Sequence, residues 1–180
     1  MDLIRIGDKL ISRSKMQRAI DQILELRVQG LSQQEAANRL GIDRSFISRL
    51  EGLGEVRRGS RIAVVGFPVA NKEEVLQVLE EEGVEYSLIL TDAERWQFAQ
   101  GKSGQQLVNE LMEIIASLRT FDAVIMIGSN YRIQLSNALL GREVIGMEIG
   151  TSPITEDKVV DVAELRTLVR SIKREKGEQL

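Results

Sequence analysis

The sequence predicts an α/β protein in two parts, a helical N-terminal domain followed by a domain built on a parallel sheet. Apolar residues recur at three- and four-residue spacing up to about residue 54, as in amphipathic helices. After residue 61, short apolar runs alternate with helical patterns, as in βα repeats that form parallel sheets with right-handed crossovers. Three glycines and three arginines within residues 52–61 indicate a linker. We therefore expect domains at residues 1–54 and 61–180, joined by a basic linker at 55–60.

The first thirty residues predict an arm followed by a helix. Five aliphatic residues within residues 1–13 predict a short strand, a turn at Gly7-Asp8 and a helical turn, which together form an arm that packs on the domain or on a second subunit. Ser14 is the expected N-cap of a helix that runs to about Gln29 and ends at Gly30.

Residues 31–51, LSQQEAANRLGIDRSFISRLE, predict two short helices joined by a tight turn. Ser32 and Glu35 have the spacing of a capping box, and Gly41 stands where a helix end often needs positive φ. Asp43 can cap the second helix, whose expected apolar stripe is Phe46, Ile47 and Leu50. With the preceding helix this makes a three-helix helix-turn-helix domain, unless the segment is a plain αα-hairpin.

The run LSQQEAANRLG followed by SFISRLE resembles the helix-turn-helix of Xre/Cro-type regulators. Small, glycine and apolar residues stand at the positions that this motif requires, namely Ala37, Gly41, Ile47 and Leu50. The chain departs from that family after the motif, because a strand follows where two further helices are usual. The resemblance implies that the second helix enters the major groove of DNA and contacts bases through Arg44, Ser45, Ser48 and Arg49.

Two further sets of residues are candidate DNA contacts. Gln33 and Gln34, in the first turn of the preceding helix, would meet phosphate or an adjacent base. In the linker, Arg57, Arg58 and Arg61 could reach a phosphate backbone or a minor groove, although a purely solubilising linker has the same composition. Residues 1–61 contain 12 Lys and Arg against 8 Asp and Glu, whereas residues 62–180 contain 12 against 19. The excess of cations therefore falls in the half that carries the motif.

The C-terminal domain is predicted to be a small Rossmann-like sheet of four parallel strands in the order 2-1-3-4. Its helices are expected to begin at capping residues, among them Asn71 with Glu74 and Thr91 with Glu94, and one helix is expected to be interrupted at Gly101. The expected strands are residues 61–67, 85–91, 122–129 and 142–150, and the expected helices are 71–82, 91–119, 130–140 and 161–176.

Ligands of such sheets bind beyond the carboxyl ends of the strands. Three loops should meet there, at residues 66–71, 128–131 and 150–153, and Gly128 also precedes a helix whose free N–H groups can hold an anion. We therefore expect Ser129, Asn130, Arg132 and Thr151 to form a site for a small anion. The alternative is a turn and an ordinary N-cap, since neither GxGxxG nor GxxxxGK[ST] is present. Trp96 and Phe98 could form a lid, but core or a subunit contact is the expected role.

Composition narrows the possible functions. The chain has no cysteine and no histidine, which excludes disulfides, Ser-His-Asp or Cys-His catalysis and a zinc site with His or Cys ligands. No apolar run approaches the ~20 residues that span a bilayer, and the N-terminus lacks a secretory pattern. We therefore expect a cytoplasmic protein with neither a cofactor nor a metal.

These observations together favour a transcriptional regulator that is not an enzyme. The expected protein is a homodimer that binds double-stranded DNA, in which the α/β domain supplies dimerisation and senses a small anionic effector. Two alternatives stay open. One is an adaptor, such as an antitoxin or partition-like protein, whose α/β domain binds a protein partner; the other is an enzyme that regulates its own expression.

Overall fold

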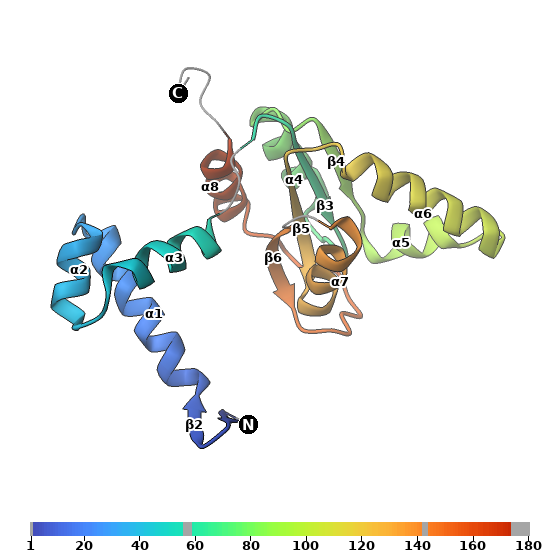
Figure 1. Ribbon diagram of the computed structural model, residues 1–180. Coiled ribbons are helices and arrows are strands. Elements are labelled where there is room, and N and C mark those ends of the chain that lie inside the picture. Colours follow the sequence, from blue (N-terminus) through green and yellow to red (C-terminus); the bar gives the residue numbers. More distant parts are fainter. Residues whose placement is uncertain (1, 56–58, 142–143, 174–180) are drawn as a thin grey trace. The chain divides into compact units, whose positions relative to one another are not determined.

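The computed structural model describes residues 2–55, 59–141 and 144–173. It divides the chain into two compact units, Met1–Glu55 and Val56–Leu180, each treated below by itself. The described residues form eight helices, a two-stranded sheet in the first unit and a four-stranded sheet in the second (Figure 1). No helix within these ranges is long and apolar enough to cross a membrane.

The N-terminal unit begins with an antiparallel hairpin, β1 (Leu3–Ile6) and β2 (Lys9–Ser12). The predicted strand and turn are confirmed, but the predicted helical turn is wrong, because residues 9–12 complete the hairpin by pairing with β1. Three aliphatic side chains of the hairpin are exposed, Leu3, Ile6 and Leu10. They are not buried against their own unit, and their packing on a second subunit stays a prediction.

Three helices follow, α1 (Arg13–Val28), α2 (Gln33–Leu40) and α3 (Arg44–Gly54). The capping box of Ser32 and Glu35 is present, and Gly41 ends α2 with φ of 65°. The N-cap of α1 is Ser12 rather than Ser14, because the Ser12 hydroxyl accepts a hydrogen bond from the Lys15 amide. Both the amide and the hydroxyl of Ser14 instead bind Asp2.

The core of this unit is small and lies where the three helices meet. Its buried members are Ile23, Ala36, Ala37 and Ile47. The predicted stripe on α3 is only partly right, because Leu50 is half-buried and Phe46 is 51% exposed. Successive helical residues are rotated by about 100°, so a helix that turns Ile47 inward directs its neighbour Phe46 outward.

The C-terminal unit is a parallel sheet in the order β4-β3-β5-β6, which confirms the predicted order 2-1-3-4. Its central strands β3 and β5 are buried on both faces, as their continuous apolar sequences predict. The bounds of the strands are β3 Ile62–Gly66, β4 Tyr86–Ile89, β5 Ala123–Ser129 and β6 Val144–Gly150, and those of the helices are α4 Lys72–Glu81, α5 Asp92–Ala99, α6 Gly104–Leu118, α7 Asn130–Leu140 and α8 Val162–Ile172.

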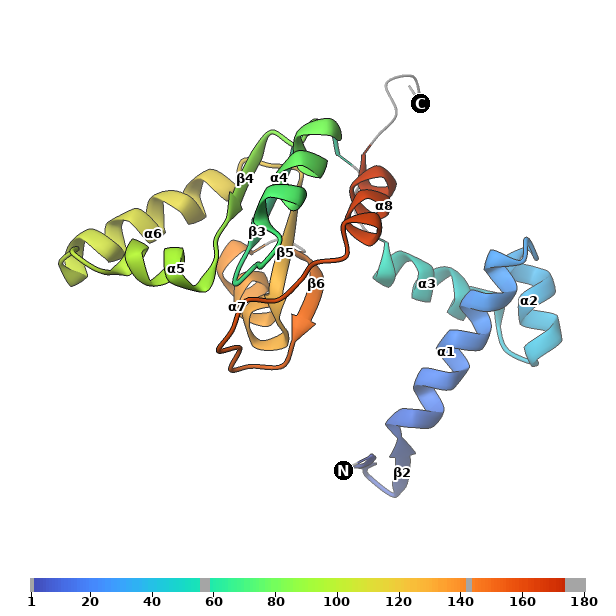
Figure 2. The ribbon, with the colours of Figure 1, turned by 180° about the vertical axis from the view of Figure 1, so that it is seen from behind.

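Alternate residues of the strands supply two separate apolar cores. Ile125 and Ile127 of β5 pack with α4 and α8 on one face, whereas Val124 and Met126 pack with the end of α6 and with α7 on the other. Figure 2 shows α4 in front of the sheet in the view from behind. The predicted interruption of the helix at residues 91–119 is confirmed, because α5 ends before Gly101, whose φ is 79°.

The side chain of Arg61 is used within the fold, contrary to the expectation of a phosphate contact. Its Nε lies 3.1 Å from Glu85 Oε2, and its Nη1 donates to the Thr120 carbonyl. Its guanidinium also lies 4.9 Å from the centre of the Phe121 ring. Arg61 therefore ties the start of β3 to neighbouring segments of the same unit.

Candidate functional site

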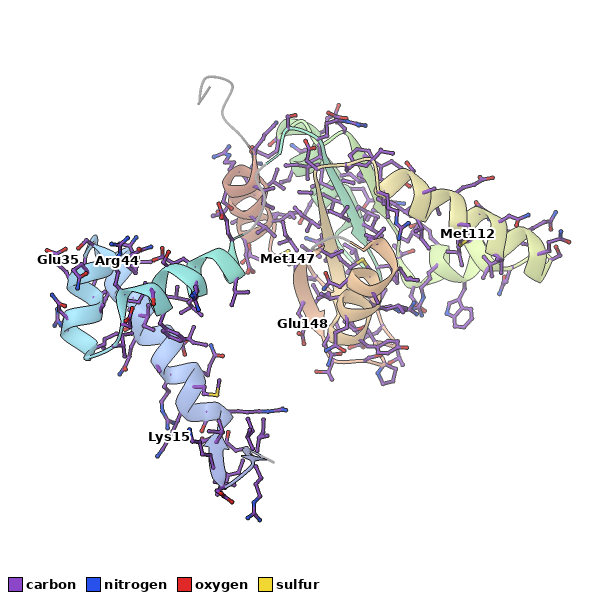
Figure 3. The ribbon with its side chains drawn as sticks, in the orientation of Figure 1. Lys15, Glu35, Arg44, Met112, Met147 and Glu148 are labelled. Atoms are coloured by element: carbon purple, nitrogen blue, oxygen red, sulfur yellow. The ribbon has the colours of Figure 1, made fainter. Side chains whose placement is uncertain are left out.

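The surface side of α3 carries a contiguous polar patch. Arg44, Ser45, Ser48 and Arg49 are all exposed, and together with Asp43 they line one shallow depression. We refer to these five residues as the α3 polar face; Arg44 is labelled in Figure 3. The four residues predicted to contact bases therefore lie together at the surface of the helix, whereas Ile47 is buried.

Asp43 fixes the beginning of this face. Its Oδ1 accepts a hydrogen bond of 2.6 Å from the Ser45 amide and so caps α3. Hydrogen bonds from Ser45 hold the pKa of Asp43 below its usual value, and the carboxylate is therefore ionised at neutral pH. A carboxylate beside Arg44 reduces the positive charge at the helix start.

Glu51, at the other end of the helix, joins all three helices of the unit. Its carboxylate accepts hydrogen bonds from Arg27 of α1 (2.5 Å) and from Gln33 of α2 (2.7 Å). Arg27 also donates to the Leu31 carbonyl. Half-buried Gln33 thus makes a contact inside the unit, while Gln34 is exposed and donates to Asn38; the contact of both with phosphate or an adjacent base stays a prediction. Arg57 and Arg58 lie outside the described residues.

The C-terminal unit has a pocket of about 550 Å³ at the carboxyl ends of its strands. It lies where the strand order reverses between β3 and β5, the usual ligand position in such sheets. Sequence reasoning named two of its residues, Ser129 and Arg132, in the anion site. The complete lining is Phe67, Pro68, Asp92, Arg95, Trp96, Ala99, Ser129, Arg132, Ser152, Pro153, Ile154 and Thr155.

Asn130 and Thr151 do not line this pocket, although both belong to the loops that surround it. The Asn130 carboxamide oxygen accepts a hydrogen bond from the Ser152 amide (3.1 Å) and so holds one loop against the other. The hydroxyl groups that reach the pocket from the last loop belong to Ser152 and Thr155. Ser129 itself is 3% exposed and accepts from the Arg132 amide, so the N-cap alternative is right for this residue.

Cationic and aromatic groups meet at the pocket wall. The Arg132 guanidinium lies 5.4 Å from the centre of the Phe67 ring. Across from it, Arg95 pairs with Asp92 at 2.5 Å and lies 5.6 Å from the ring of Trp96. Trp96 is 57% exposed, so a place in the core is wrong for this residue, and the other expected role, a subunit contact, stays a prediction. Sequence reasoning missed Arg95, although the confirmed Thr91–Glu94 capping box fixes where α5 begins and hence where Arg95 lies.

Asn71 links two segments of the C-terminal unit that are far apart in the sequence. Its Oδ1 accepts from the Val160 amide (2.9 Å) and its Nδ2 donates to the Val160 carbonyl (3.0 Å). The same Nδ2 lies 3.0 Å from Glu74, and the predicted N-cap bond is absent. Asn71 therefore joins the loop after β3 to the segment before α8 and does not cap α4.

These groups suit binding of an anion. Two guanidinium groups, three hydroxyl groups, the Asp92 carboxylate and the aromatic rings of Phe67 and Trp96 surround the pocket. In the described part of the chain, no three acidic side chains come close enough to hold a metal ion. Comparisons with protein-family models, with curated proteins and with solved structures give no match for this chain. Its function is therefore inferred from the geometry of its own residues.

Proposed function

We propose that this protein is a sequence-specific DNA-binding transcriptional regulator. The observation that carries the proposal is the α3 polar face. Arg44, Ser45, Ser48 and Arg49 are exposed together on a helix whose other side packs on α1 and α2. A short helix presented in this way fits the major groove, where an arginine can donate two hydrogen bonds to guanine.

The turn between α2 and α3 supports this function. Gly41 and the Asp43 cap make the connection short, so that α2 crosses close to the beginning of α3. The charge distribution also fits, because residues 1–61 carry the excess of cations and would lie near phosphate. One helix of this length contacts few base pairs, and we therefore propose a homodimer that binds two half-sites about 34–36 Å apart.

We further propose that the C-terminal unit senses a small anionic effector. The open pocket at the strand ends, with Arg95 and Arg132 in its wall, supports this role over that of a protein-binding adaptor, for which filled apolar strand ends would be expected. Coupling would arise if the effector altered the spacing of the two DNA-reading helices in the dimer.

Selection of bound fragments from a random DNA library by the purified full-length protein tests the proposal. A common motif is expected, with two related halves if the protein is a dimer. Arg44→Ala and Arg49→Ala should each relax the preference at one or two positions, by about 1–3 kcal/mol per lost contact. Lys158→Ala, which removes the same charge from an ion pair of the C-terminal unit, is the matched control and should leave the motif unchanged.

Two results would overturn the DNA-binding proposal. One is a selection that yields no motif and no retained DNA at low salt. The other is a motif that neither arginine substitution alters, which would remove the α3 polar face from recognition. Copurification of a stoichiometric second protein, in place of DNA, would favour the adaptor.

A further inference from the structure

A second cavity lies behind the pocket at the strand ends, and its wall is almost entirely apolar. It has a volume of about 420 Å³, within the range of small-molecule sites. Its floor is the sheet face formed by Val65, Val124 and Met126, and Leu107, Leu111 and Ile114 of α6 form the opposite wall. A small anion bound in the polar pocket would leave this apolar space empty.

The cavity exists because α6 packs on the sheet only near its C-terminal end. Leu118 is buried there, whereas the earlier apolar residues Val108, Leu111 and Met112 are between 43% and 60% exposed. Figures 1 and 2 show α6 extending away from the sheet beyond β4. The first turns of the helix therefore overhang the sheet without filling the space beneath.

The polar pocket and the apolar cavity share one mouth. Phe67, Arg95, Ala99 and Arg132 line both of them. Arg132 rests on the Phe67 ring and has no carboxylate partner among the described residues, while Arg95 is paired with Asp92. Two guanidinium groups and one carboxylate thus leave a net positive charge where the apolar space opens.

We propose that the C-terminal unit binds an amphiphilic anion, with its carboxylate or phosphate head on Arg132 and its aliphatic tail in the cavity beneath α6. This inference rests on the proposed role of the unit as an anion sensor and names the class of effector. Charge complementarity selects the head group, because no carboxylate within residues 2–55, 59–141 and 144–173 pairs with Arg132. The apolar wall selects the tail, because transfer of methylene groups from water is favourable.

Trp96 is the only tryptophan of the chain and lines the polar pocket, so its fluorescence reports ligands directly. The full-length protein is titrated with acetate, hexanoate, octanoate, octyl phosphate and octan-1-ol. The dissociation constant is expected to fall about fourfold for each added methylene, which corresponds to ~0.8 kcal/mol. Octan-1-ol should bind at least about tenfold more weakly than octanoate, because it lacks the charge. Comparison of octanoate with octyl phosphate identifies the preferred head group.

Two substitutions distinguish the contribution of the head group to binding from that of the aliphatic tail. Arg132→Gln should weaken octanoate about tenfold and leave octan-1-ol unchanged. Ala99→Leu, which adds bulk at the shared mouth, should weaken octanoate more than acetate. Ala93→Leu is its matched control, since Ala93 is exposed on the same helix and lines neither space.

If acetate binds as tightly as octanoate, the proposal of an amphiphilic ligand is overturned, whereas the proposal of a small-anion sensor stands. Failure of every acid to bind would overturn both, while the DNA selection tests the N-terminal unit independently. If the affinity for octanoate falls as the protein concentration rises, the cavity is occupied by α6 of a second copy of this chain. That result would also overturn the proposal.

Discussion

Glu51 accepts a hydrogen bond from Arg27 across the N-terminal unit, with 2.5 Å between Oε1 of the carboxylate and Nε of the guanidinium. The two residues lie on α3 and α1, and Gln33 of α2 binds the other carboxylate oxygen. One side chain therefore fixes the position of α3 relative to both supporting helices. The core of this unit has only four buried residues, so polar contacts of this kind are important for the arrangement of its helices.

The first prediction concerns the pH dependence of this link. Hydrogen bonds from Arg27 and then Gln33 hold the pKa of Glu51 below its usual value of 4.5. A carboxyl whose pKa is lower in the folded state contributes stability above its usual pKa and loses that contribution as the pH falls through the folded-state pKa. Glu51→Gln should therefore destabilise the N-terminal unit at neutral pH, and its difference from the wild type should shrink in acid.

Hydrogen exchange of the α1–α3 amides, measured by mass spectrometry on the full chain, checks this prediction. Glu25→Gln is the control, because Glu25 is exposed on α1. A difference between wild type and Glu51→Gln that is constant from neutral to acid pH would show that the charge of Glu51 does not stabilise the unit.

The second prediction concerns the turn before α3. Gly41 has φ of 65°, a conformation that costs an L-residue about 1–2 kcal/mol, so Gly41→Ala should destabilise the N-terminal unit by about 1 kcal/mol. Gly52→Ala is the matched control with the opposite sign, because Gly52 lies within α3 and a Cβ there meets nothing within 4 Å. It should stabilise the same unit by about 0.5–1 kcal/mol. Chemical denaturation followed by circular dichroism gives both values, and equal effects would contradict the assigned turn geometry.

The third prediction concerns the packing of α7 on β6. A Cβ built at Gly146 would lie 2.6 Å from Cγ2 of Ile133, a side chain whose branched Cβ limits its movement. Gly146→Ala should therefore destabilise the C-terminal unit by about 1–3 kcal/mol. Gly104→Ala, in the first turn of α6, meets nothing within 4 Å and should not be destabilising. Denaturation followed by the fluorescence of Trp96 compares the two, and similar midpoints would mean that α7 packs differently.

The fourth prediction concerns the link between Asn71 and Val160. Asn71→Ala leaves both the amide and the carbonyl of Val160, a residue 1% exposed, without their partner. The expected cost is about 1–3 kcal/mol. Exchange of amides in residues 158–161 should also accelerate, because their link to the loop after β3 is lost. Gln77→Ala on α4, which removes a carboxamide from the surface, is the control, and unchanged exchange in both variants would contradict the bridging role.

Local sequence signals predicted the elements well where the interaction that forms them is also local. The capping boxes at Ser32 and Thr91 and the glycine after α2 involve residues within a turn of each other, and all three are confirmed. The strand order was predictable as well, because buried parallel strands alternate with helices and crossovers have a fixed hand. In the α3 polar face, the same periodicity accounts for Ser48 and Arg49, which are rotated by about 100° and 160° from the buried Ile47.

By itself, then, the sequence determined most of the helices and strands, the order of the parallel strands and the junction of β5 and α7 that supplies Ser129 and Arg132. Only the tertiary structure decided that Gln33 binds Glu51, that Asn71 bridges to Val160, and that the first turns of α6 overhang the sheet above an apolar cavity. The physical reason is distance along the chain. Asn71 and Val160 are 89 residues apart, and no local periodicity or capping pattern encodes which of several polar groups a folded chain brings within hydrogen-bonding distance.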